Sequence, residues 1–106
     1  GHSNTKISLE SYTASINEDK VTMVDFYTTW CGPCKRMAPD VVKLRNEFAG
    51  KANVLQVDAE KYMDISSLYQ LKGYPTIMFF KSGKLLATEL GMLSYAKLKS
   101  KLESHM

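Results

Sequence analysis

The sequence predicts an α/β fold in which helices flank both faces of a mixed central sheet, and three observations support this prediction. Residues 21–28 form a nearly continuous apolar run, which is typical of a central strand buried on both faces. Other strand-like runs alternate with stretches of helical periodicity, and strand–helix–strand units are usually parallel. Two late strand-like runs flank the two-residue loop Ser82-Gly83, which predicts an antiparallel hairpin. The expected order of elements is βαβαβαββα.

The first strand and the first helix are expected near the N-terminus. Residues 4–8 are assigned to a short strand, and Ser8 is suited to cap the helix that follows. The inward face of that helix is marked at helical spacing by Leu9, Tyr12 and Ile16. Residues 1–3 (Gly-His-Ser) are interpreted as a scar of tag cleavage, which leaves residues 4–106 as a single domain.

A second helix is expected from residue 35 to residue 49, directly after the central strand. Pro33 fits its first turn, where the missing N–H costs nothing, and Gly50 is a natural stop. Pro39 lies inside the helix and should kink its axis. The inward stripe is expected at Met37, Val41, Leu44 and Phe48.

The second half of the chain is expected to supply three more strands and two more helices. The strands are predicted at residues 53–58, 76–81 and 84–90, and Gly91 ends the last of them. A short helix between the first two strands should bury Ile65, Leu68 and Tyr69. Ser94 is expected to cap a final helix that buries Tyr95, Leu98 and Leu102. Met37, Met63 and Met78 fall on apolar faces and are assigned to the core.

Composition narrows the functional classes. The chain has 106 residues, 44% of them hydrophobic and 24% charged, which are values typical of a globular domain. A net charge of +3 is scattered along the chain, without the concentrated basic face that nucleic-acid binding requires. No run approaches the roughly 20 apolar residues of a membrane span. We therefore expect neither nucleic acid nor a membrane as a partner. The chain is separately expected to be a monomer.

The only two cysteines form the motif Cys31-Gly32-Pro33-Cys34. Zinc is a poor explanation, because structural zinc needs four Cys or His ligands and the two histidines lie near opposite ends of the chain. A structural disulfide is also a poor one, because closing so short a loop stabilises little. The motif therefore predicts a reversible dithiol, and the restriction of cysteine to this motif favours a reducing cytoplasm.

The two thiols are expected to differ in role. Cys31 lies in a loop at the start of a helix, where outward N–H groups favour its thiolate, so we expect an exposed nucleophile. Cys34, one turn further inward, should resolve the mixed disulfide. Asp25 lies within the apolar strand, so burial should raise its pKa and suit it to accept the proton of Cys34.

Several separated features make the chain resemble the thioredoxin family over residues 5–104. They are Trp-Cys-Gly-Pro-Cys-Lys after a strand that ends in Val-Asp-Phe, Asp25 six residues before Cys31, Pro39 within a helix, and Tyr74-Pro75-Thr76 before a hairpin. The resemblance implies a thioredoxin fold and a protein-disulfide reductase active in cell redox homeostasis. It also implies no bound cofactor, with electrons supplied from NADPH by a separate flavoprotein, thioredoxin reductase.

The resemblance further implies a groove for disulfide-containing target proteins. It implies a cis Tyr74–Pro75 bond that lies against the cysteines and exposes the Tyr74 backbone to the substrate. Trp30 is interpreted as an apolar docking surface, and Gly32 allows a partner's backbone to come close. The full set expected to contact substrate is Trp30, Gly32, Pro33, Tyr74, Pro75, Gly91 and Met92.

Two departures and two alternatives accompany this interpretation. Tyr27 stands where many thioredoxins have Trp, and Val54 stands where many bacterial members have a Lys partner for the buried Asp. A protein disulfide isomerase domain is an alternative, although Pro33 argues against it because isomerases usually have His between their cysteines. A non-catalytic binding subunit is the other, but it would need neither cysteine.

Overall fold

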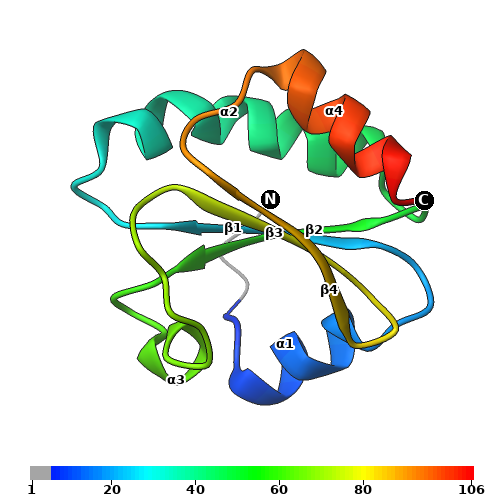
Figure 1. Cartoon of the computed structure of the whole chain (residues 1–106), viewed down its shortest axis with the longest axis horizontal. Coiled ribbons are helices and arrows are strands. Elements are labelled where there is room, and N and C mark those ends of the chain that lie inside the picture. The colour runs from blue at the N-terminus through cyan, green and yellow to red at the C-terminus, as the bar shows by residue number, and fades with distance from the viewer. Residues whose placement is uncertain (1–5) are drawn as a thin grey trace.

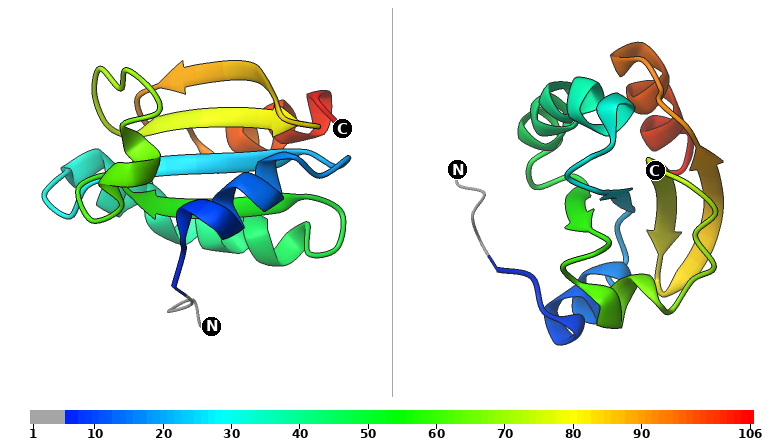
Figure 2. Two further views of the ribbon diagram at one scale, coloured as in Figure 1. Left: turned by 90° about the horizontal axis from the view of Figure 1, so that it is seen from below. Right: turned by 90° about the vertical axis from the view of Figure 1, so that its left-hand side faces the viewer.

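Four strands form one mixed sheet in this computed structural model, which describes residues 6–106. They are β1 (Thr22–Tyr27), β2 (Asn53–Asp58), β3 (Thr76–Lys81) and β4 (Lys84–Leu90). The order across the sheet is β2-β1-β3-β4, which Figure 2 shows in its left view. β1 runs parallel to β2 and antiparallel to β3, and β3 pairs with β4 in an antiparallel hairpin. The mixed sheet is therefore confirmed.

Helices cover both faces of this sheet, as expected. The four helices are α1 (Leu9–Ile16), α2 (Gly32–Glu47), α3 (Met63–Ser66) and α4 (Tyr95–Ser104). α2 and α4 pack on one face, and α1 and α3 pack on the other (Figure 1). Each face encloses its own apolar core. β1 lies between the two cores, which explains why its sequence is almost continuously apolar.

Local sequence accounts for the helix starts. Ser8 accepts a hydrogen bond from the backbone N–H of Ser11, and the Ser11 hydroxyl accepts one from the N–H of Ser8. Ser94 caps α4 in the same way through the N–H of Lys97. α2 begins directly after Cys31, which places both residues between the cysteines in its first turn.

Several expectations about the N-terminus and α3 need correction. Residues 6–8 are not a strand, while residues 1–5, which include the proposed tag scar and the start of that strand, lie outside the described residues. Met63 and Leu68 are exposed rather than buried, with 66% and 56% of their surface accessible. α3 has only four residues, so it cannot sustain an inward face over the predicted length. Leu9 is also exposed, because it opens the first turn of α1.

Candidate active site

Cys31 and Cys34 lie at the N-terminal end of α2 and are joined by a disulfide. Cys31 is the residue before the helix, and its Sγ accepts a hydrogen bond of 3.2 Å from the backbone N–H of Cys34. This N–H is one of the donors that have no partner within a helix, so a thiolate at Cys31 would be stabilised by it and by the helix dipole. The start of α2 thus favours a thiolate at Cys31 over one at Cys34.

Cys31 is buried rather than exposed, which corrects the expectation from sequence. Only 5% of its surface is accessible, against 3% for Cys34. The cause is a contact across the fold, because the Sγ of Cys31 lies 3.5 Å from the carbonyl oxygen of Tyr74. The loop before β3 therefore lies against the redox pair and narrows access to it.

That loop carries the Tyr74–Pro75 bond, which is cis, as the resemblance implied. Beside it, Trp30 meets the Tyr74 ring edge to face, with the ring centroids 6.2 Å apart. The Trp30 side chain is 63% exposed, and its indole N–H is 3.1 Å from each carboxylate oxygen of Glu60. A large apolar surface is thus held in a fixed orientation next to the disulfide.

The remaining residues expected in the groove lie on two segments. Gly32 and Pro33 form the first turn of α2 and are half-buried. Gly91 has a φ of +101° and donates its N–H to the carbonyl oxygen of Pro75 at 2.9 Å, so the segment after β4 is tied to the cis bond. Met92 follows it and is 46% exposed. The structure brings Gly91 to Pro75, whereas no described contact joins Met92 to the cysteines.

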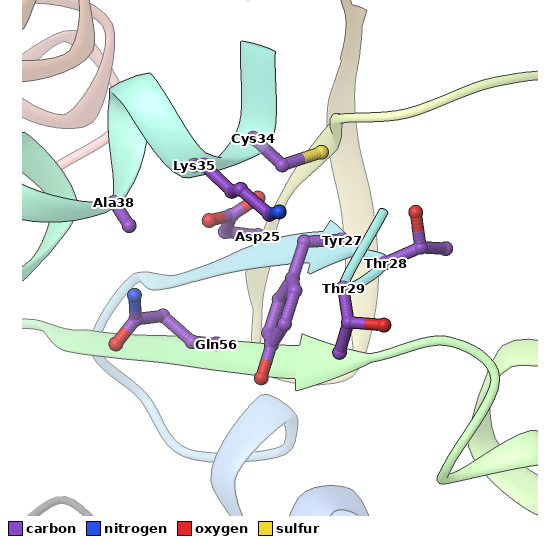
Figure 3. Close-up of a pocket in the computed structure, with 8 residues that line it drawn as sticks. All are labelled: Asp25, Tyr27, Thr28, Thr29, Cys34, Lys35, Ala38 and Gln56. Atoms are coloured by element: carbon purple, nitrogen blue, oxygen red, sulfur yellow. The ribbon is translucent and has the colours of Figure 1, made fainter. Parts of the chain in front are cut away.

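Asp25 lies behind the disulfide, in the middle of β1. Only 1% of it is exposed, and burial raises its pKa to about 7. It shares with Cys34 the lining of a pocket of about 320 Å³ (Figure 3). Among residues 6–106, Asp25 Oδ1 has no hydrogen-bond partner in the protein. A carboxyl whose pKa lies near neutral pH is therefore available in the pocket that Cys34 lines.

Gln56 is a residue of this pocket that sequence analysis missed. It is the direct partner of Asp25 across β1 and β2, whereas Val54 pairs with Met23 and is buried in the core. The Oε1 of Gln56 accepts a hydrogen bond of 3.1 Å from the guanidinium of Arg45 on α2. The only signal in the sequence was a polar residue at an inward position of the strand 53–58.

The described part of the chain contains neither a cluster of metal ligands nor a membrane-spanning helix. Among residues 6–106, no group of three His, Cys, Asp or Glu side chains is placed to hold a metal ion. Over the same residues, no helix has the length and apolar content needed to cross a membrane.

Comparison with known proteins decides the family. A family model described as Thioredoxin matches residues 3–104. This chain belongs to the thioredoxin family. It is 36% identical to the thioredoxin of Acidithiobacillus ferridurans over 91 residues, which cover 86% of this chain and 84% of that protein. The thioredoxin of Pseudomonas aeruginosa is 33% identical with the same coverage.

Solved structures support the same fold. A structure titled as Plasmodium falciparum thioredoxin superposes with a TM-score of 0.83 at 27% identity, covering 93% of this chain and 95% of that one.

A longer relative is also similar in sequence. The rice protein named Thioredoxin Y, chloroplastic, is 38% identical, but the match spans only 51% of its length. The chain is thus a thioredoxin-type thiol–disulfide oxidoreductase with a Cys31–Cys34 redox pair, as expected for a protein-disulfide reductase.

Proposed function

We propose that Cys31 attacks target disulfides, that Cys34 resolves the resulting mixed disulfide, and that Asp25 accepts the proton of Cys34. The observation that carries this proposal is the asymmetry of the pair. The Sγ of Cys31 receives an N–H at the start of α2, whereas Cys34 shares a pocket with a buried carboxyl. The roles follow from the chemistry of these two environments.

In the first step the thiolate of Cys31 attacks one sulfur of the target disulfide. A bond forms between the Sγ of Cys31 and that sulfur, the target's own S–S bond breaks, and its second sulfur leaves as a thiolate that takes up a proton. The N–H of Cys34 supports the attacking charge before the step.

In the second step Cys34 gives its proton to the carboxylate of Asp25, and its thiolate attacks the Sγ of Cys31. The mixed disulfide breaks, the target leaves with its second sulfur reduced, and the Cys31–Cys34 disulfide forms. Two electrons have passed from the pair to the target. Burial supports the role of Asp25, because a pKa of about 7 lets it hold or release a proton near neutral pH.

The target is proposed to bind over the exposed surface around Cys31. Trp30 and Met92 offer apolar contact, and the loop at Tyr74 and Pro75 offers backbone groups. Gly32, which has no side chain, and the ring of Pro33 lie in the first turn of α2. The backbone N–H of Gly91 donates a hydrogen bond to the carbonyl oxygen of Pro75.

The family implies a thioredoxin reductase and target proteins in general. We propose in particular that a flavoprotein reductase returns electrons from NADPH to a monomer formed by residues 4–106 as one domain, with no bound cofactor of its own. We propose the cytoplasm as its compartment, because both cysteines belong to the redox motif.

Reduction of insulin by dithiothreitol, followed by turbidity, tests the catalytic role. The wild type should accelerate precipitation and Cys31→Ser should not. When reduced Cys34→Ser is incubated with insulin after removal of dithiothreitol, it should accumulate a mixed disulfide with insulin. Equal acceleration by the wild type and by Cys31→Ser would instead favour a binding subunit. Recycling by NADPH with a thioredoxin reductase, compared with recycling by glutathione, tests the electron source.

A further inference from the structure

The pocket behind Cys34 contains a polar side chain directly opposite Asp25. Gln56 of β2 pairs with Asp25 of β1 in a parallel register, so both side chains leave the sheet on the face covered by α2. Both line the same pocket of about 320 Å³, together with Cys34 (Figure 3). Gln56 is half-buried, so its amide is partly withdrawn from bulk water.

Arg45 determines the orientation of the Gln56 side-chain amide, because it holds the amide oxygen. A guanidinium has only donors, so the atom that meets Arg45 at 3.1 Å must be the amide oxygen. The NH₂ group of Gln56 is then left free to donate elsewhere. In Figure 3 the amide nitrogen lies on the side of Asp25 and Ala38, and the oxygen lies on the opposite side.

The pocket also holds acceptors that this donor could serve. Within residues 6–106, Asp25 Oδ1 and Thr28 Oγ1 are buried without a hydrogen-bond partner in the protein, and both residues line the pocket. The volume is sufficient for water, and several polar groups converge on it. A donor, two unpartnered groups and space for water therefore lie together.

Other charged or titratable side chains also line the pocket around Asp25. Lys35 of α2 and Tyr27 of β1 line the pocket, in addition to Cys34. None of the ion pairs found among residues 6–106 includes Asp25 or Lys35. On the β3 side, Asp25 pairs with the apolar Ile77. Gln56 is thus the neutral donor on the strand next to Asp25, and Arg45 acts on it from α2.

We propose that Gln56, oriented by Arg45, is a positioning residue for proton transfer from Cys34 to Asp25. Its NH₂ group donates to the ionised carboxylate through a water in the pocket, and so favours the form of Asp25 that accepts a proton. The proposal rests on the role of Asp25 given under the proposed function.

The test compares Gln56→Met, which keeps the volume and removes the donor, with Arg45→Met, which keeps Gln56 and frees its amide. Lys43→Met is the matched control, because it removes a positive charge from the same helix at a side chain that lies over the Tyr95 ring. Two quantities are measured for each reduced protein between pH 5 and 10. They are the titration of the Asp25 carboxyl by carbon NMR and the rate of mixed-disulfide resolution by stopped flow.

Gln56→Met should move both midpoints up by about one pH unit, because the carboxylate loses one hydrogen bond. Resolution at pH 7 should then slow by about fivefold and recover above pH 9. Arg45→Met should move the midpoints in the same direction, and Lys43→Met should leave them where the wild type has them. Wild-type midpoints in Gln56→Met, or equal behaviour of Arg45→Met and Lys43→Met, would overturn the proposal.

Asp25→Asn separates this inference from the one on which it depends. If Asp25→Asn leaves the pH dependence of resolution unchanged, the proton-acceptor role of Asp25 is wrong. If Asp25→Asn abolishes that dependence while Gln56→Met retains the wild-type profile, Asp25 is the acceptor and only the role of Gln56 is wrong.

Discussion

Replacing Asp25 with asparagine should stabilise the protein at alkaline pH and leave its stability nearly unchanged at pH 4. Asp25 is 1% exposed, and its pKa rises from 3.8 to about 7 on folding because burial disfavours its charge. Between these two values the folded state holds a proton that the unfolded chain has released. The free energy of unfolding of the wild type therefore falls as pH rises through this window.

The magnitude follows from the size of the shift. Each pKa unit corresponds to 1.36 kcal/mol, so ionising Asp25 in the folded state costs about 4 kcal/mol above pH 7. Asn is neutral at every pH and nearly isosteric, so Asp25→Asn avoids this cost. Its free energy of unfolding should exceed that of the wild type by up to about 4 kcal/mol at pH 8.5 and by only about 0.5 kcal/mol at pH 4.

Urea denaturation of the oxidised proteins at intervals from pH 4 to pH 9 measures this difference. Groups other than Asp25 contribute equally to both proteins and cancel in the comparison. Asp64→Asn serves as a control, because it removes an exposed acid at the start of α3. A difference between wild type and Asp25→Asn that is the same at pH 4.5 and pH 8.5 would refute the reasoning.

Three further predictions concern the surface in front of Asp25. In the reduced protein, limited iodoacetamide should label Cys31 before Cys34, and peptide mass spectrometry that finds equal labelling would contradict the assignment. Trp30→Ala should raise KM for protein disulfides by about tenfold, because a large docking side chain is lost, and should hardly change reduction of a small aromatic disulfide. Gly91→Ala should cost about 1 kcal/mol in urea denaturation, because its φ of +101° disfavours any Cβ; an unchanged midpoint would argue against that conformation.

The elements that sequence placed correctly are those with a strong local signal. The strands at 53–58, 76–81 and 84–90 have the predicted bounds, because their apolar runs and the Ser82-Gly83 turn mark them locally. Residues 6–8 lack a comparable pattern and are not a strand. The predicted inward face around α3 was wrong at Leu68, which lies beyond the four-residue helix and meets solvent.

In the candidate site, too, features with a local sequence signal could be predicted, and features that depend on distant contacts could not. The cysteine pair and the burial of Asp25 could be predicted, because a short motif and an apolar strand encode them. The burial of Cys31 could not, since it depends on Tyr74, which is 43 residues away in the chain. Gln56 was missed for a related reason. Its importance appears only when the register of β1 and β2 places it opposite Asp25.

Stability and proton transfer at Asp25 are two measurements of one equilibrium, which allows a final test. Any substitution that raises the pKa of Asp25 must deepen the loss of stability at alkaline pH by about 1.4 kcal/mol for each pH unit. Gln56→Met should therefore destabilise the wild type more at pH 8.5 than at pH 4. In the Asp25→Asn background the same substitution should have an effect that does not depend on pH.

This double-mutant cycle isolates the contact between the two side chains from the packing of Gln56 itself. A packing defect would appear equally in both backgrounds and at both pH values. A pH-dependent effect that survives in Asp25→Asn would mean that Gln56 acts on a titrating group other than Asp25. A pH-dependent effect that disappears there would tie the amide of Gln56 to the proton on Asp25.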